Sequence, residues 1–177
     1  MNRRNRQLLE ELCAERFGDL LALATLVSAS PSSARDLVDH AIAASFARLR
    51  HFRSLDEADA SVRRHILNRT VKASSSPPVH GDEPLVERTD GDGAYAAVDP
   101  QLWSALRVLG ARERVCVVLR FVEKLSVPQA AALLGWSETE VERAAADGIE
   151  SLSRALDTAI PAEWPELAAV SNKRGTR

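Results

Sequence analysis

The stretch from Ser126 to Leu156, which reads SVPQAAALLGWSETEVERAAADGIESLSRAL, constrains the fold more than any other part of the chain. A serine followed three residues later by Glu or Gln is typical of a helix start, because each side chain can bond a backbone N–H of the other residue. Ser126 with Gln129 and Ser137 with Glu140 fit this pattern, a short turn apart. The stretch therefore predicts two helices joined by a short turn, a helix-turn-helix.

The second of these helices has one apolar face and one acidic face. Its apolar residues recur at spacings of three and four, which places them on one buried side. These residues are Val141, Ala145, Ile149, Leu152 and Leu156. In a DNA-binding helix-turn-helix the second helix enters the major groove with its first residues on base edges. Yet residues 138–150 carry five acids and the single base Arg143, a balance that would repel phosphates.

Charge and composition divide the 177-residue chain into three segments. Residues 1–73 carry 12 basic and 9 acidic side chains, residues 74–100 carry 1 and 6, and residues 101–177 carry 10 of each. The middle segment is rich in Ser, Pro, Gly and acids without a sustained period, which is typical of a flexible acidic linker. No segment is as basic as an autonomous DNA-binding domain, so any DNA binding would need a further component.

Apolar spacing predicts an all-α chain of two small helical domains, residues 1–73 and 101–157, followed by a tail over residues 158–177. In the first domain we expect one or two helices between Leu8 and Val27 with a break near Phe17, a helix capped by Ser33 that ends near Arg50, and a helix over Glu57 to Ala73. In the second domain we expect helices over Gln101 to Leu109 and Arg112 to Phe121, separated by Gly110, ahead of the helix-turn-helix. No stretch has a β-strand pattern that we would assign.

The residues give no support for catalysis or for a bound cofactor. The four histidines lie apart from both cysteines, and no glycine-rich phosphate loop, nucleophile elbow or metal-ligand spacing is present. We therefore expect no catalytic residue, no metal and no cofactor. Cys13 and Cys116 both lie in apolar helical patterns and are expected to be buried, reduced thiols. No apolar run of signal or membrane length follows the basic start of the chain, so we expect no membrane contact and a cytoplasmic location.

The order of these parts resembles a known family. Ser32 to Leu49 (SSARDLVDHAIAASFARL) and Val62 to Val71 (VRRHILNRTV) are similar to two helices of bacterial alternative sigma factors of the extracytoplasmic-function type, in the sigma-70 family. Ala111 to Val141 (ARERVCVVLRFVEKLSVPQAAALLGWSETEV) is similar to the family's run of spaced arginines, an LS cap and an LG.S turn. The resemblance implies a helical region 2, a linker, and a four-helix region 4 that ends in a helix-turn-helix.

The resemblance implies that the first domain binds core RNA polymerase and the −10 promoter element. The β′ clamp helices of the polymerase would contact Asp36, Leu37, Val38 and Asp39. The residues that would capture and melt the −10 element are Arg50, Phe52, Arg53, Arg63, Arg64 and Asn68. Leu37 and Val38 can instead be core residues, and Asn68 an ordinary amide on a helix surface. Since Phe17, Phe46 and Phe52 are the only aromatic residues of this domain, few side chains could stack on unpaired bases.

The resemblance implies that the second domain reads the −35 element and contacts the β flap of the polymerase. Arg112, Arg114 and Arg120 match basic residues near the DNA backbone, although Arg112 and Arg114 can instead form an exposed helix face. The positions at the start of the recognition helix are Ser137, Glu138, Thr139, Glu142 and Arg143. Glu140 and Glu142 replace the usual Thr and Lys. Glu140 is explained as the cap partner of Ser137, whereas Glu142 has no such structural reason.

Two functions follow from these observations. The first is an alternative sigma factor that binds core RNA polymerase and directs promoter recognition and transcription initiation, under the control of an anti-sigma factor. The second is a divergent sigma-like regulator that no longer reads promoters and binds a protein partner, an anti-sigma factor or another transcription regulator, through its acidic helix. The acidic helix favours the second function. The first is nevertheless the leading hypothesis, because polymerase would link the two DNA contacts in one complex, so that a weak reader can suffice.

Overall fold

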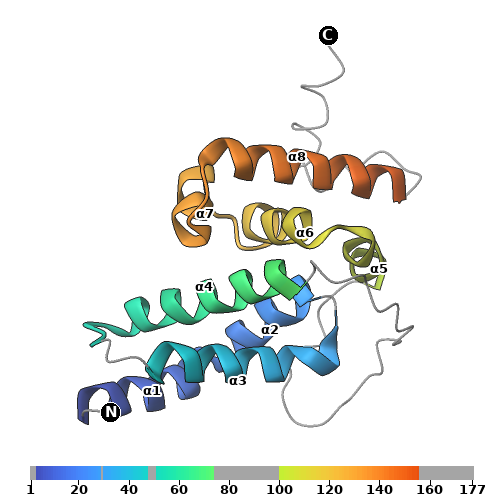
Figure 1. Cartoon of the computed structure of the whole chain (residues 1–177). Helices are drawn as coiled ribbons and strands as arrows, with labels where there is room; N and C mark the ends of the chain where they lie inside the picture. The colour runs from blue at the N-terminus through green and yellow to red at the C-terminus, as the bar shows by residue number, and fades with distance from the viewer. Residues whose placement is uncertain (1–2, 29, 48–50, 74–99, 156–177) are drawn as a thin grey trace. The chain divides into compact units, whose positions relative to one another are not determined.

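The computed structural model describes residues 3–28, 30–47, 51–73 and 100–155, and every regular element in these ranges is helical. The chain divides into two compact units between Val98 and Asp99. The first unit holds α1 (Arg3–Glu15), α2 (Phe17–Ser28), α3 (Pro31–Ala47) and α4 (Leu55–Ala73) (Figure 1). The second holds α5 (Pro100–Val108), α6 (Ala111–Val117), the π-helical turn η1 (Val118–Val122), α7 (Val127–Leu134) and α8 (Glu138–Ala155). The all-α prediction is confirmed.

Two of the predicted segments fall almost wholly outside the described residues. These are the linker over residues 74–100, of which only Pro100 is described as the start of α5, and the tail over residues 158–177. Among the helices that the structure describes, none is both long and apolar enough to cross a membrane.

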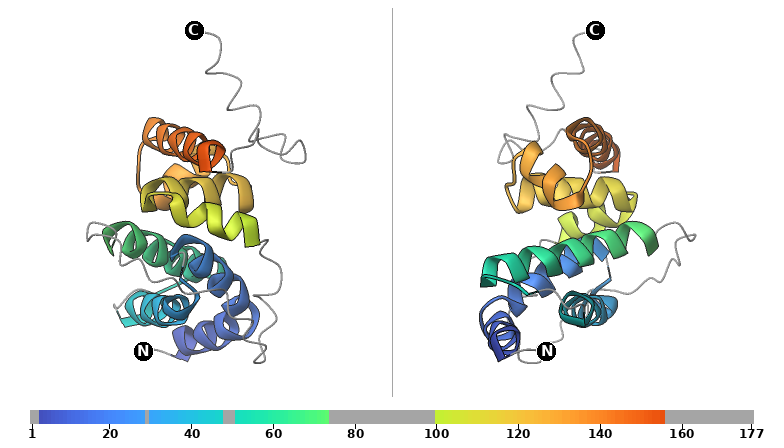
Figure 2. Two further views of the ribbon diagram at one scale, coloured as in Figure 1. Left: turned by 90° about the vertical axis from the view of Figure 1, so that its right-hand side faces the viewer. Right: turned by 60° about the vertical axis from the view of Figure 1, so that its left-hand side comes forward.

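In the first unit α2, α3 and α4 pack on one another, and α1 closes the side formed by α2 and α4 (Figure 2). Seven of the twelve residues of α2 are buried, which makes it the central helix of this unit. Burying one leucine or isoleucine side chain stabilises a fold by roughly 1.5–3 kcal/mol. The largest fully buried side chains of this core are Leu12, Leu20, Leu23, Val27, Val38, Val62, Ile66 and Leu67.

The helix boundaries of the first unit refine the predicted ones. The expected break near Phe17 is confirmed, because α1 ends at Glu15 and α2 begins at Phe17. The predicted cap at Ser33 is wrong: α3 begins at Pro31, as suits proline at the first helical position, and the Ser33 hydroxyl donates to the Ser30 carbonyl at 3.2 Å. The helix predicted from Glu57 begins two residues earlier, where the Ser54 hydroxyl caps it by accepting the Glu57 N–H at 3.2 Å.

The two cysteines differ in burial. Cys13 is exposed, so the prediction of two buried thiols is wrong for this residue. The reason is helical phase, because Leu8 and Leu12 take the buried face of α1 and Cys13 lies one residue beyond it. Cys116 is buried as expected. Burial raises the pKa of its thiol to about 12, although the positive charge of Arg112 acts to lower that pKa.

In the second unit α8 lies along α6, and α7 packs near the start of α8 (Figure 1). Together with α5 and η1 these helices form the core of the unit, which contains Leu106, Val115, Leu119, Leu134, Val141, Ile149 and Leu152. The single helix predicted over Arg112 to Phe121 is instead α6 followed by η1, in which the Glu123 N–H donates to the Val118 carbonyl five residues back at 3.0 Å. Lys124, with φ of 55°, then turns the chain into the left-handed region, away from the helix.

Gly148 is the point of closest approach between α8 and α6. A Cβ atom built at this position would lie 2.7 Å from Cγ2 of Val117 and 3.2 Å from Cβ of Glu113. Val117 is itself buried and its branched side chain is stiff, so it could not move aside cheaply. The absence of a side chain at Gly148 therefore sets the spacing of the two helices that form the core of this unit.

We expect Gly148→Ala to lower the free energy of unfolding by about 1–2 kcal/mol. Overpacking a core costs about 1–3 kcal/mol, which exceeds the gain of up to about 1 kcal/mol that alanine has over glycine inside a helix. Urea unfolding followed by helical circular dichroism measures the change. Gly18→Ala in α2 is the control, because a Cβ atom there meets nothing within 4 Å. Equal stability of the two variants would contradict the proposed close packing.

Candidate nucleic-acid interface

The helix-turn-helix of α7 and α8 contains both predicted capping boxes, one at the start of each helix. The Ser126 hydroxyl accepts the Gln129 N–H at 3.3 Å, and the Gln129 side chain accepts the Ser126 N–H at 2.8 Å. Gly135 ends α7 with φ of 71°, a left-handed conformation that glycine adopts without steric cost. The helix-turn-helix prediction is confirmed in its local geometry, because both caps and the glycine turn lie where the sequence places them.

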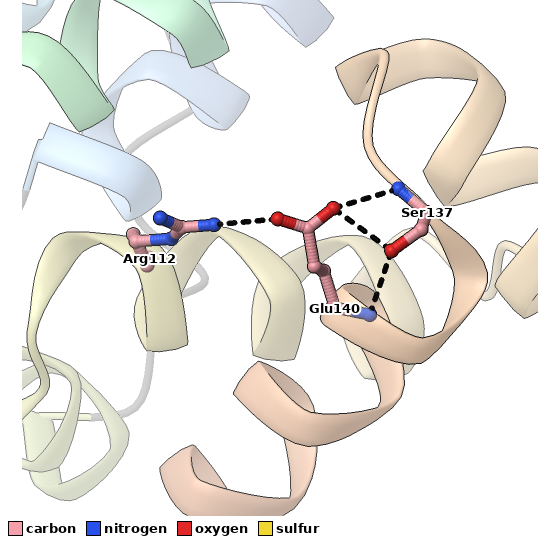
Figure 3. Close-up of polar contacts among 3 residues, drawn as sticks. All are labelled: Arg112, Ser137 and Glu140. Carbon is pink, nitrogen blue, oxygen red and sulfur yellow. Dashed lines mark hydrogen bonds and ion pairs between the residues drawn. The ribbon is translucent and has the colours of Figure 1, made fainter.

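The second capping box, at the start of α8, also contacts a neighbouring helix. The Glu140 carboxylate accepts the Ser137 N–H at 2.9 Å and the Ser137 hydroxyl at 2.8 Å, while the Ser137 oxygen accepts the Glu140 N–H at 3.3 Å (Figure 3). The other carboxylate oxygen of Glu140 lies 3.5 Å from Nη2 of Arg112 on α6. Ser137 and then Arg112 hold the pKa of the Glu140 carboxyl below its usual value. This carboxylate therefore connects the start of α8 to α6.

The Arg112 guanidinium also lies over the ring of Trp136, 4.4 Å from its centroid. Such a cation–π contact orients a guanidinium plane and is worth about 0.5–1 kcal/mol at an exposed site. The side chain of Arg112 nevertheless remains 58% exposed. Arg112 is thus held in one place at the surface, between the aromatic turn residue and the carboxylate of Glu140.

The other two arginines that the sequence assigns to the DNA backbone are engaged inside the second unit. Nε of Arg114 donates to the Leu106 carbonyl at 2.8 Å, and its Nη2 donates to the Leu109 carbonyl at 2.6 Å. Burial, and then the charge of Arg107, lower the pKa of the Arg114 guanidinium. Nη1 of Arg120 donates to the Leu125 carbonyl. Both side chains satisfy carbonyls at chain turns, so the alternative of an exposed helix face fits Arg112 and does not fit Arg114.

The outward face of α8 is acidic at its start. Its predicted base-reading residues after the cap are all exposed: Glu138, Thr139, Glu142 and Arg143. Nε of Arg143 lies 3.8 Å from the carboxylate of Asp147, and Arg154 pairs with Glu150 at 3.7 Å near the helix end. Such exposed i, i+4 pairs contribute only about 0.3–0.5 kcal/mol each. The face that a partner would meet therefore carries more acids than bases.

In the first unit the predicted −10 residues lie in different environments. Phe52 is 3% exposed and packs edge-on against Phe46 at 5.1 Å between ring centroids, so its ring is not available to stack on a base. Nε of Arg63 donates to Asp59 at 2.8 Å, and both side chains are only 17% exposed. The predicted residues Arg53 and Arg64 are exposed, and Asn68 is half-buried. Arg50 lies outside the described residues.

The predicted polymerase-binding segment divides between surface and core. Asp36 and Asp39 are exposed on α3, whereas Leu37 and Val38 between them are buried. The alternative that Leu37 and Val38 are core residues is therefore the one that the structure supports. An acidic pair of side chains three residues apart is left on the outer face of this helix.

Sequence reasoning missed two groups of contacts. One joins α3 and α4, where the Ser45 hydroxyl lies 3.1 Å from Nδ1 of His65 and that nitrogen lies 2.9 Å from the Ser61 carbonyl oxygen. This group satisfies polar atoms in a buried helix contact. The other is the contact of Arg112 with Trp136 and Glu140.

Residues 3–28, 30–47, 51–73 and 100–155 hold no group of three potential metal ligands.

The comparisons with known proteins agree with this arrangement. Residues 100–152, from the start of α5 to the last turn of α8, match the family model described as "Sigma-70, region 4". The chain is 29% identical over 155 residues to the RNA polymerase sigma-E factor of Streptomyces antibioticus, which covers 84% of each chain. It is 31% identical over 140 residues to the RNA polymerase sigma-E factor of Streptomyces coelicolor, covering 75% of this chain and 77% of that relative. No solved structure matches the chain significantly.

The carbonyl contacts of Arg114 predict a structural cost on its removal. We expect Arg114→Leu to lower the free energy of unfolding by about 1–3 kcal/mol, because the Leu106 and Leu109 carbonyls lose their charged donor in a partly buried place. Arg112→Leu, on the same helix but exposed, is the control and should cost less than about 1 kcal/mol. Thermal unfolding of the full chain measures both changes, and a smaller loss for Arg114→Leu than for Arg112→Leu would contradict the assignment.

Proposed function

The chain belongs to the extracytoplasmic-function type of the sigma-70 family of RNA polymerase sigma factors, and from this premise we propose that its two units read the two elements of a promoter. As a member of this family it is a DNA-binding regulator of transcription initiation, not an enzyme. The first unit binds the −10 element and the second binds the −35 element. The observation that carries the proposal is the helix-turn-helix of α7 and α8, whose second helix begins with exposed side chains in a region that matches sigma region 4.

For the first unit we propose that Asp36 and Asp39 contact the β′ clamp helices of core polymerase. Their exposure on one helix, next to buried neighbours, supports this role because the carboxylates are free to meet a basic surface while the helix stays anchored. Arg53, Arg64 and Asn68 are the proposed −10 contacts. Since Phe52 is buried, it supports the turn before α4 instead of stacking on bases.

For the second unit we propose that Thr139 and Arg143 contact −35 bases and that Arg112 contacts the backbone, with the β flap of the polymerase as the neighbouring protein. Glu138 and Glu142 weaken phosphate binding, but a carboxylate can accept a hydrogen bond from cytosine N4. The polymerase joins both units on one DNA, so the weaker contact gains from a high effective concentration. We place this activity in the cytoplasm, with the polymerase, under the control of an anti-sigma factor.

A second candidate is a sigma-like regulator that binds a protein partner and no longer reads promoters. The observation that favours it is the acidic outer face of α8, where Glu138 and Glu142 are exposed and Arg143 lies near Asp147. A basic protein surface would be attracted by this face, while DNA phosphates would be repelled. This candidate predicts that the chain binds a protein partner and directs no specific transcripts.

Reconstitution with core polymerase tests the proposal. We expect the chain and core polymerase together to give discrete transcripts from a genomic template pool that core polymerase alone does not give. The double variant Asp36→Arg with Asp39→Arg should weaken core binding about tenfold or more, a change of ~1.4 kcal/mol. Asp19→Arg, an exposed acid of α2 outside the proposed surface, is the control and should bind as the wild type does.

Two results would count against the sigma activity. Failure of the chain to associate with core polymerase would contradict it outright. Association with the polymerase that gives no discrete transcript from the pool would favour the protein-binding regulator instead.

A further inference from the structure

Three hydrogen-bond donors converge on the Glu140 carboxylate. They are the Ser137 N–H at 2.9 Å, the Ser137 hydroxyl at 2.8 Å and Nη2 of Arg112 at 3.5 Å (Figure 3). A backbone N–H, a hydroxyl and a guanidinium are the groups that proteins use to bind phosphate oxygens. The carboxylate thus occupies a place whose donors suit a phosphate equally well.

The guanidinium at this place is preorganised. Cζ of Arg112 lies over the Trp136 ring, 4.4 Å from its centroid, a cation–π contact that holds the guanidinium without using its N–H groups. The side chains of Arg112 and Glu140 are 58% and 53% exposed, so water and a larger anion can reach their contact. An exposed ion pair of this kind is weak and screened by salt. A phosphate can therefore displace the carboxylate while Arg112 stays over Trp136.

Arg112 is also distinguished from the other arginines of α6 and η1. Arg114 and Arg120 donate to backbone carbonyls, which are fixed in the chain and cannot move aside for a phosphate. The acidic partner of Arg112, in contrast, is a side chain that can move aside, and the Ser137 oxygen still accepts the Glu140 N–H when the carboxylate leaves. Exchange of one anion for another at Arg112 therefore leaves the α8 cap intact.

We propose that Arg112, Trp136 and Ser137 form a binding site for one backbone phosphate of the promoter, which the Glu140 carboxylate occupies in the free chain and yields when DNA arrives. This inference rests on the proposed function and deepens it, since it assigns Glu140 as the residue that withholds backbone affinity from the free protein. All DNA then competes with an internal anion, which lowers the affinity of the free chain for nonspecific duplex, whereas a promoter presented by the polymerase gains from a high effective concentration.

The test compares full-length variants binding to a labelled duplex of random sequence across a salt series. Glu140→Gln keeps an oxygen that can accept from Ser137 but removes the charge that holds Arg112. We expect this variant to bind about tenfold more tightly near 0.1 M salt, because the phosphate no longer has to displace a carboxylate. The slope of log K against log salt should stay close to that of the wild type, since Arg112 contacts one phosphate in both complexes. Glu142→Gln is the matched control. It removes the same charge from the same helix, and the side chain of Glu142 has no hydrogen bond or ion pair with any described residue. We expect a smaller gain and an unchanged slope.

The double variant Arg112→Gln with Glu140→Gln should lose the gain of Glu140→Gln. Three results would overturn the proposal: equal gains in Glu140→Gln and Glu142→Gln, a gain that survives in the double variant, or no duplex binding by Glu140→Gln even at low salt. If Glu140→Gln fails to fold, Arg112→Gln decides the matter. Its slope should be shallower than that of the wild type by about 0.9 if phosphate replaces Glu140, and an unchanged slope would overturn the proposal.

These measurements use the free chain and need no polymerase. Failure of the sigma activity is read separately, as the absence of core binding, so the failure of one claim can be told apart from the failure of the other.

Discussion

The Glu140 carboxylate bonds at once to the start of its own helix and to a neighbouring helix, and the exposed face of the second unit depends on this double contact. Its bonds to Ser137 determine where α8 begins, and hence which side chains point outward in the first turn. Its ion pair with Arg112 adds a contact between residues 28 positions apart. Because Ser137 and Arg112 depress the pKa of Glu140, these contacts stabilise the fold above the ordinary carboxyl pKa, and the stabilisation is lost as pH falls through the lower folded value.

The hydrogen bonds and the ion pair that three arginines make inside the second unit accompany its acidic recognition helix. Arg114 and Arg120 donate to backbone carbonyls, and Arg112 is paired with a carboxylate, so the N–H groups of these three arginines are partly used inside the free second unit. Low intrinsic affinity is compatible with function when polymerase supplies the second attachment point. It also lowers the competition from nonspecific DNA, which depends almost entirely on phosphate contacts. The acidic helix is thus consistent with a promoter reader that acts only within the polymerase complex.

The parts of the structure that follow from local sequence were predictable, and those that depend on long-range contacts were not. Both capping boxes and the glycine turn were predicted correctly because their partners lie within three residues of each other. The pairing of Arg112 with Glu140 could not be predicted, since nothing in a spacing pattern shows that α6 approaches the start of α8. The same limit applies to Arg114. Its charge suggested an exposed residue, but it donates to the carbonyls of Leu106 and Leu109, at the C-terminal end of α5 and just beyond it. Phe52 was assigned to DNA as the aromatic residue of a basic turn, and only the packing against Phe46 reveals that it is buried.

The most direct test of this account is the pKa of the Glu140 carboxyl, measured by NMR titration of the full chain with and without saturating duplex DNA. In the free chain we expect a pKa below the usual glutamate value, because Ser137 and Arg112 stabilise the carboxylate. With DNA bound, the pKa should rise, because a phosphate takes Arg112 and places a negative charge nearby. In Arg112→Gln the free-chain pKa should already be higher than in the wild type. An identical Glu140 pKa in the free and the DNA-bound wild-type chain would show that Arg112 keeps its carboxylate partner on DNA, and would contradict the account.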